Sequence, residues 1–223
     1  MFLSRYSSIS GYGTLQKGRR LLSLNHFQSH TASSIPNISA LNAPIQRTVD
    51  EALVIHQAQL LLDQKSYVIN LIKAEDYVKK VPSIYHSSIG SHLRHSFDHF
   101  SALLRAASSN EGFANYDERA RDTIVESNRE AALNLIQEMK DKINQLDLSK
   151  KIEVSFIGNE KTYEAYKIPS TVLRELSFAS HHAVHHLSMV KLILQHLNYQ
   201  LPENSPLGIA LSTAKDIESK QNK

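Results

Sequence analysis

Ser180-His-His-Ala-Val-His-His-Leu-Ser-Met189, a segment with four of the chain's twelve histidines, lies inside a run of residues, 170–201, without glycine or proline. Such an uninterrupted run predicts one long helix. Three further histidines, His92, His95 and His99, stand on a second stretch whose apolar residues recur at helical spacing. We expect the two helices to meet and their histidines to bind one divalent metal ion.

The composition narrows the chemistry of such a site. The chain has 223 residues, which suffices for one domain of ordinary size plus a tail. It has no cysteine, so disulfides, thiolate zinc sites and cysteine nucleophiles are excluded, and a metal must be held by His, Asp or Glu. No apolar run approaches the roughly 18 residues that cross a bilayer, so we expect no membrane partner.

The formal net charge of +3 comes from the N-terminal segment. Residues 1–49 carry five basic residues and no acidic one, and the remainder is slightly acidic, so we expect no nucleic-acid partner. A segment that is rich in Ser and Arg and poor in acids is typical of an organellar transit peptide. We therefore interpret residues 1–43 as a disordered N-terminal segment that directs the protein to a mitochondrion or another organelle. The alternative is a disordered tail that carries no targeting signal, on a cytoplasmic protein.

Three helices are expected before the histidine-rich one. The first covers residues 48–80 with a break near Ser66, the second starts between residues 85 and 88 and ends at Ala107, and the third covers residues 118–146. Alternating apolar residues at 151–156, the pair Gly158-Asn159 and the stretch 162–168 predict a β-hairpin. Ser170 is the expected N-cap of the last helix. The fold class we predict is all-α, an antiparallel four-helix bundle with a small hairpin before its last helix.

A helical wheel separates the two histidine pairs of the last helix. His182 and His186 fall on one shoulder of the apolar face, whereas His181 and His185 point away from it. Glu175 lies on the same shoulder as the first pair and could orient an imidazole by accepting its second N–H. On the earlier helix, periodicity favours His92 and His99 over His95. The alternative to a metal site is a partly solvated histidine patch.

Several of these segments together resemble the DinB-like (DinB/YfiT-type) superfamily, and above all its uncharacterised bacterial members. The motif Ser88-Ile-Gly-Ser-His-Leu-Arg-His-Ser-Phe-Asp-His-Phe100 is followed by Asn115-Tyr-Asp-Glu-Arg-Ala-Arg121, Glu126, Arg174-Glu-Leu and His182-Ala-Val-His-His186. The likeness covers about residues 43–215, so the domain is expected at 44–215, with a polar tail at 216–223. Leu211 stands where these proteins usually have proline, which puts a role of this terminal motif in question.

The resemblance implies a four-helix bundle with one metal ion held by three histidines. By position these are His95, His182 and His186, with His99 and His92 in reserve. Zinc or nickel suits an all-imidazole site better than iron, which usually has a carboxylate ligand as well. Members of the superfamily include thiol-dependent transferases, an isomerase that uses a small thiol and iron-dependent sulfur-transfer enzymes.

The function we expect is a metal-dependent hydrolase or thiol-dependent transferase acting on a small molecule, such as a thiol conjugate. Asp98 and Glu126 are candidates for the general base. A set of arginines could bind an anionic substrate: Arg94, Arg119, Arg121 and Arg174. The alternatives are a metal-binding protein without catalysis and a structural helical bundle that forms a homodimer.

Overall fold

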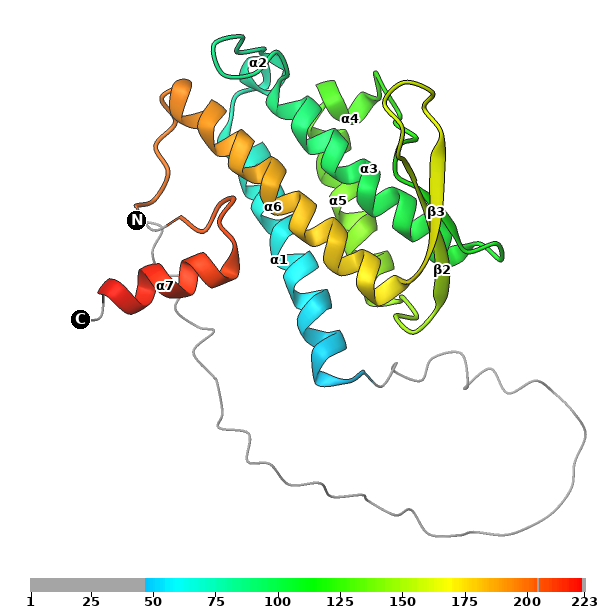
Figure 1. Cartoon of the computed structure of the whole chain (residues 1–223). Helices are drawn as coiled ribbons and strands as arrows, with labels where there is room; N and C mark the ends of the chain where they lie inside the picture. The colour runs from blue at the N-terminus through cyan, green and yellow to red at the C-terminus, as the bar shows by residue number, and fades with distance from the viewer. Residues whose placement is uncertain (1–46, 204, 222–223) are drawn as a thin grey trace, which may run out of the picture. The chain divides into compact units, whose positions relative to one another are not determined.

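The computed structural model describes residues 47–203 and 205–221, and this part of the chain is mostly helical (Figure 1). The helices are α1 (Val49–Leu71), α2 (Ala74–Val78), α3 (Ile89–Ser108), α4 (Ile124–Ser127), α5 (Arg129–Asn144), α6 (Val172–His196) and α7 (Leu211–Gln221). The strands are β1 (Phe113–Asn115), β2 (Lys151–Ile157) and β3 (Ala165–Thr171). The prediction for residues 1–43 lies outside the described part.

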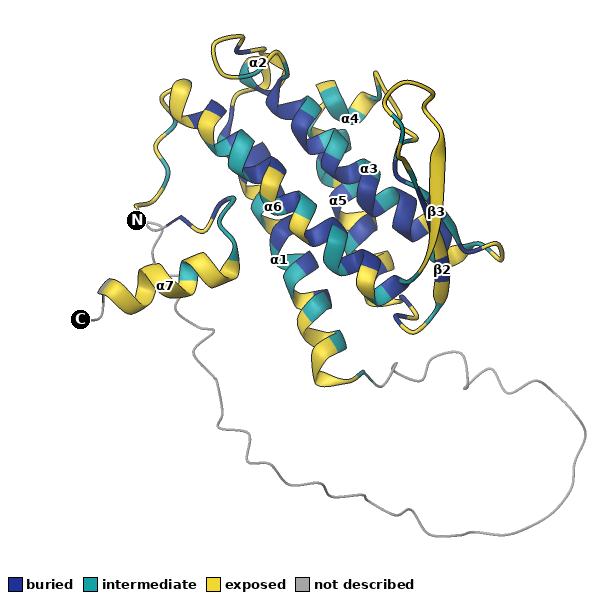
Figure 2. Cartoon of the chain, in the orientation of Figure 1, coloured by how far each residue is buried: buried dark blue, intermediate teal, exposed yellow. Residues whose placement is uncertain are grey.

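The core lies where α1, α3, α5 and α6 pack against one another. Helix α6 contacts both α1 and α3, and α5 contacts α1 and α3 from the other side. Buried residues line the sides of α3, α5 and α6 that face each other (Figure 2). Apolar burial along these helices is the main stabilising contribution, and it fixes α3 and α6, the helices that carry the two histidine clusters, side by side.

The start of each long helix follows from a polar cap. Thr48 and Glu51 form a reciprocal capping box at α1, and the Ser88 hydroxyl accepts from the backbone N–H of Ser91 at α3. The start of the second helix is thus confirmed.

The predicted break near Ser66 is wrong, because the chain leaves the helix at Ile72. There Arg129 donates to the carbonyl oxygens of Ile69 and Ile72, which have no partner within the helix.

The β-hairpin is confirmed as the antiparallel pair β2–β3, but a third strand was not predicted. Strand β1 pairs in parallel with β2, so the sheet is mixed and has the order β1-β2-β3. The third predicted helix is wrong over residues 118–123, which are irregular and include Asp122 at a φ of 55°. The predicted cap Ser170 is wrong as well. Strand β3 continues through it, and Thr171 caps α6.

The C-terminal segment crosses α6 before it forms a helix. Gly208 has a φ of +66°, and a Cβ there would lie 2.4 Å from the backbone nitrogen of Ser188, so only glycine allows this approach. Leu207 beside it is buried. The polar tail expected at 216–223 is helical as far as Gln221, because α7 runs across the expected boundary at residue 215. No helix within the described residues is both long and apolar enough to cross a membrane.

Candidate metal centre

Five histidines from two helices meet between α3 and α6. Helix α3 supplies His92, His95 and His99, and α6 supplies His182 and His186. Spacings of three and four residues place each set on one helical face. As the wheel predicted, His186 is buried and His182 half-buried, whereas His181 and His185 are exposed.

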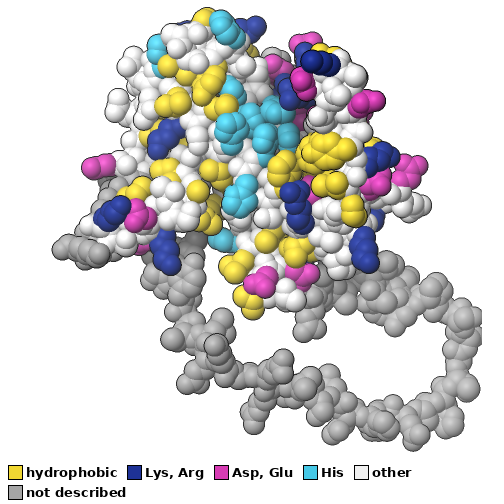
Figure 3. All heavy atoms as spheres, in the orientation of Figure 1, with side chains coloured by type: hydrophobic (Ala, Val, Ile, Leu, Met, Phe, Trp, Pro, Cys, Tyr) yellow, Lys and Arg dark blue, Asp and Glu magenta, His cyan; other side chains and the backbone are white. Residues whose placement is uncertain are grey.

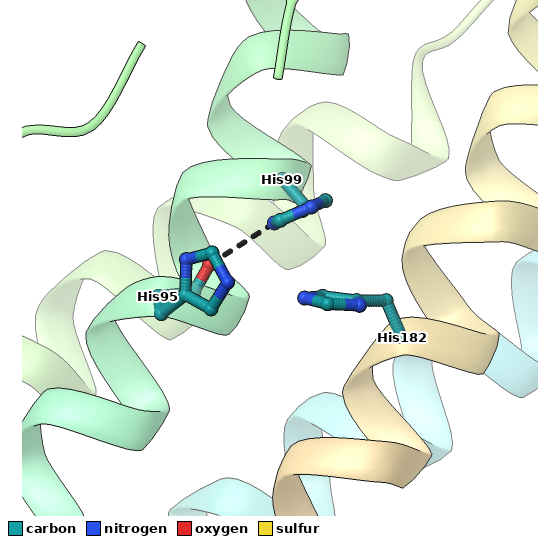
Figure 4. Close-up of side chains that lie close together, drawn as sticks. All are labelled: His95, His99 and His182. Carbon is teal, nitrogen blue, oxygen red and sulfur yellow. Dashed lines mark hydrogen bonds between the residues drawn. The ribbon is translucent and has the colours of Figure 1, made fainter. Parts of the chain in front are cut away.

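Three of these side chains come close enough to share an ion. His95, His99 and His182 each offer a ring nitrogen, and these atoms all lie within 4.8 Å of one another. The rings of His95 and His99 extend from α3 and that of His182 from α6 (Figure 4). Two of the three expected ligands, His95 and His182, therefore lie in this group together with the reserve residue His99.

His186, the third expected ligand, lies outside this group of three but touches one of its members. Its Nε2 atom is 3.0 Å from Nε2 of His182, and its Nδ1 atom is 3.3 Å from Nδ1 of His92. The rings of His95, His182 and His186 are 4.6–5.2 Å apart and steeply inclined to one another. Two nitrogens bound to one ion at about 2 Å each are separated by roughly 3 Å. The contact between His182 and His186 therefore also suits a shared ion.

The hydrogen bonds of these rings show which nitrogens can bind a metal. Nδ1 of His99 lies 3.1 Å from the carbonyl oxygen of His95, which can only accept, so Nδ1 carries the proton and Nε2 the lone pair. Nδ1 of His95 and Nε2 of His92 are buried and have no hydrogen-bond partner among the described residues. Buried polar atoms are almost always satisfied. The donor set thus fits a divalent ion.

All five rings are held in the neutral form that metal binding requires. Burial and the neighbouring imidazoles lower the pKa of His95 to about 4, of His182 to about 3 and of His186 to about 2. Burial also lowers the pKa of His92 and of His99. At neutral pH the cluster therefore carries no charge of its own to repel a cation.

The centre reaches the surface. His95 and His182 are half-buried, and histidine side chains gather over α3 and α6 on the face shown in Figure 3. Two surface hollows of about 330 and 370 Å³ lie elsewhere, one between α3 and α5 and the other beside α7. Neither is lined by a histidine of the cluster. A ligand would therefore approach the centre from an open face.

The two candidate bases are both bound to Arg94. Its Nη1 atom is 2.6 Å from Asp98 Oδ2, and its Nε atom is 3.0 Å from Glu126 Oε2, in an ion pair without hydrogen-bond alignment. Ser91 also donates to Glu126 at 2.5 Å. Burial raises the pKa of Asp98 although Arg94 acts in the opposite direction. The network attaches the segment around α4 to α3, and it leaves Arg94 engaged with carboxylates.

The other candidate arginines lie at the edge of the centre. Arg119 and Arg121 are exposed, and the charge of Arg119 is one of the causes that lower the pKa of His95 and His99. Arg174 binds Glu175 at 2.7 Å and lies over the ring of Phe178. Arg119 is thus the candidate best placed to attract an anion toward the histidines.

Glu175 is completely buried, but its hydrogen bonds go to Ser170 and Arg174. No imidazole N–H donates to it within the described structure. Its link to the histidines runs through Tyr116, whose ring stacks on His99 at a centroid distance of 5.2 Å. Tyr116 was not singled out from the sequence, although it belongs to the segment 115–121 that carries the resemblance.

Comparison with known proteins gives one partial likeness. The chain is 31% identical over 107 residues to FK506-binding protein 5 of Rhizopus delemar, a match that covers 47% of this chain and 27% of that protein. The chain thus spans about a quarter of the length of the curated relative that it matches. No protein-family model matches the sequence. No solved structure matches it either.

Proposed function

We propose that this chain is a metal-binding protein of the DinB-like type, with α1, α3, α5 and α6 as the helices of an antiparallel four-helix bundle. One divalent ion would bind between α3 and α6, and we expect zinc or nickel in preference to iron. The observation that carries the proposal is the convergence of ring nitrogens from His95, His99 and His182 within 4.8 Å, from two helices far apart in sequence.

His95 and His182 are ligands in this proposal, and His186 supplies the third nitrogen. The contact of 3.0 Å between His182 Nε2 and His186 Nε2 supports this choice, as does the DinB-like motif. His99 is the alternative third ligand, because its ring nitrogen lies within 4.8 Å of those of His95 and His182. Its Nε2 lone pair is free, but its ring is stacked between those of His182 and Tyr116. We therefore assign His99 to the support of the ligands.

The activity proposed is hydrolysis or thiol-dependent transfer on a small molecule. A divalent ion held by His95, His182 and His186 would supply a Lewis acid that could acidify a bound water or thiol and polarise a carbonyl. The open face beside His95 and His182 would admit the substrate, and Arg119 would attract an anionic group to it. Asp98 could accept a proton only if its ion pair with Arg94 loosens.

A second candidate function is metal binding without catalysis. Both candidate bases, Asp98 and Glu126, are bound to Arg94, and neither hollow described above adjoins the histidines. A protein that senses or stores a metal needs the ligands but neither a free base nor a substrate pocket. Activity screening with thiol and ester substrates separates the two candidates once metal binding is established.

The test is the metal content of the full chain, produced without a histidine tag and measured by plasma mass spectrometry. We expect about one divalent ion per chain, and none in the His182→Ala/His186→Ala variant. The His181→Ala/His185→Ala variant is a matched control, since it changes two exposed histidines at the same spacing on the same helix. It should keep the metal.

Two single variants decide the third ligand. His186→Ala should lose the metal, whereas His99→Ala should keep it with weaker affinity. The reverse result would exchange the two assignments. A parent protein that takes up no zinc, nickel or iron would disprove the metal proposal and leave a structural bundle, for which oligomeric state is the next measurement.

A further inference from the structure

A stack of aromatic rings runs from the centre into the sheet. The rings of His182 and His99 are 3.9 Å apart at 30°, those of His99 and Tyr116 are 5.2 Å apart at 18°, and those of Tyr116 and Phe156 are 5.3 Å apart at 25°. Tyr116 thus lies between an imidazole and the β2 side chain Phe156. Offset stacking at such distances is favourable and restricts how the rings can rotate.

The backbone around Tyr116 is fixed by the sheet. Tyr116 directly follows β1, and its N–H donates to the carbonyl oxygen of Ser155 at 3.3 Å. The next residue, Asp117, accepts from the backbone N–H of Ile157 at 2.5 Å. The position of the ring is therefore set by the parallel pairing of β1 with β2, which makes Tyr116 a rigid support.

Tyr116 packs on the part of α6 that carries the completely buried Glu175: its ring is 5.3 Å from that of Phe178, three residues further along the helix. Burial and this carboxylate raise the pKa of Tyr116. No hydrogen bond joins the two groups in this structure: Tyr116 Oη and Glu175 Oε2 are both buried and both lack a partner among the described residues. The hydroxyl can donate and the carboxylate can accept, so each could satisfy the other. Ser170 and Arg174 hold the other carboxylate oxygen, Oε1.

We propose that Tyr116 and Glu175 form a positioning pair: the Glu175 carboxylate anchors the Tyr116 hydroxyl, and the Tyr116 ring holds the stacked imidazoles of His99 and His182 in the orientation in which the centre binds its metal. Neither residue touches the ion or a substrate. The pair acts through His99, and in this respect it rests on the metal centre proposed above. Groups that hydrogen-bond a metal ligand directly typically contribute 10–100-fold to affinity, and we expect the pair, which orients His182 through His99, to contribute within this range.

The variants Tyr116→Phe and Glu175→Gln test the pair, because each keeps the shape of the side chain and removes one half of the interaction. Tyr77→Phe is the matched control. Tyr77 is also a buried tyrosine, but its hydroxyl donates to the carbonyl oxygen of Val125 at 2.6 Å, outside the histidine cluster. All three are made in the full chain.

Zinc affinity is measured by competition with a chromogenic chelator. We expect a 10–100-fold loss for Tyr116→Phe and for Glu175→Gln and none for Tyr77→Phe, even where the control unfolds at a lower temperature. A cobalt-loaded sample adds a spectroscopic signature, since its visible bands report ligand geometry and should change only in the first two variants. Equal affinity loss in Tyr77→Phe would overturn the proposal and reduce Tyr116 to a packing residue.

A second measurement does not need the metal. Two-bond nitrogen–proton spectra of ¹⁵N-histidine report the tautomer of each ring. In chelator-treated parent protein His99 should show one fixed tautomer with its proton on Nδ1. In Tyr116→Phe and Glu175→Gln the spectra of His99 should show the average of two exchanging tautomers, whereas Tyr77→Phe should keep the single tautomer. Unchanged spectra in the first two variants would overturn the pair. A parent protein that shows the fixed tautomer but takes up no zinc would contradict the proposed function, and only the part of the proposal that the pair orients the imidazoles would stand.

Discussion

Lys65 donates from Nζ to the Oγ atom of Ser96 at 2.7 Å inside the core, and neither side chain is exposed to solvent. The amine lies over the rings of Phe97 and Phe100, at 4.8 and 4.7 Å from their centroids. Within the described residues no carboxylate forms an ion pair with it. Burial lowers its pKa from 10.5 to about 7.

A buried amine without a counter-ion costs stability, so Lys65→Met should stabilise the protein. Methionine has a similar length and no charge, so the substitution removes the cost of desolvating the amine, which we expect to amount to a few kcal/mol. Urea denaturation at pH 7 measures the change. Asp63→Met on the exposed side of the same helix is the control; it loses only the surface ion pair with Lys140 and should change stability by at most about 1 kcal/mol. A marked loss of stability in Lys65→Met would show that the amine has a role in the native state that its contacts do not reveal.

The lowered pKa of Lys65 also makes the free energy of unfolding depend on pH above neutrality. Between pH 7 and 10.5 the unfolded chain keeps the Lys65 proton while the folded chain has released it. Stability therefore rises with pH across this window. The difference in unfolding free energy between the parent and Lys65→Met should shrink as pH rises from 7 to 10. A constant difference would contradict the lowered pKa.

Acid should destabilise the chelator-treated protein through the histidine cluster. The pKa values of His95, His182 and His186 are lowered from 6.5 to about 4, 3 and 2, so the unfolded chain binds protons first as pH falls. Stability is full above pH 6.5 and declines from there toward pH 3. Thermal unfolding over this range measures it. His182→Ala/His186→Ala should flatten the decline, whereas His181→Ala/His185→Ala should not, and an equal effect of both would contradict the assignment.

Gly90→Ala should destabilise the protein. A Cβ at this position would lie 2.1 Å from the backbone carbonyl oxygen of Glu126, so α3 and the turn at α4 would have to separate. Forced overpacking of this kind costs about 1–3 kcal/mol. Thermal unfolding checks the prediction. An unchanged unfolding temperature would show that the α4 segment is free to move away.

Arg94→Gln should loosen that same segment. It removes the charge that holds Asp98 and Glu126 together and leaves two carboxylates near each other, 14% and 26% exposed. Hydrogen exchange of residues 120–127 should become faster, and that of α5 should stay slow. Unchanged exchange in the segment would show that Ser91 and Tyr77 hold it without the ion pairs.

The helices and the hairpin were accessible from sequence because their apolar periodicity and caps are local. Strand β1 was not, since Phe113-Ala-Asn115 is too short to show a pattern and its partner β2 lies beyond α5. The break at Ile72 depends on Arg129, which is equally distant in sequence.

Within the site, the wheel separated His182 and His186 from their exposed neighbours correctly. The wheel of α3 favoured His92 and His99 over His95 as ligands, because it scores only how close a residue lies to the apolar face. His95 lies at the half-buried edge of that face, which packs toward α6. Tyr116 was missed for the same reason as β1, because its position depends on a parallel strand pair.

The parallel pairing of β1 with β2 also constrains the order of folding. Helices α4 and α5 lie between the two strands in sequence, so the pairing closes a long stretch of chain. Closing such a stretch costs chain entropy before the contact is gained, so we expect this pairing to form slowly. Tyr116 is placed by that pairing, so the aromatic support of the histidines is completed only near the end of folding. In a nascent or partly folded chain the imidazoles would therefore be far apart, and only the folded protein would present them together to a metal ion.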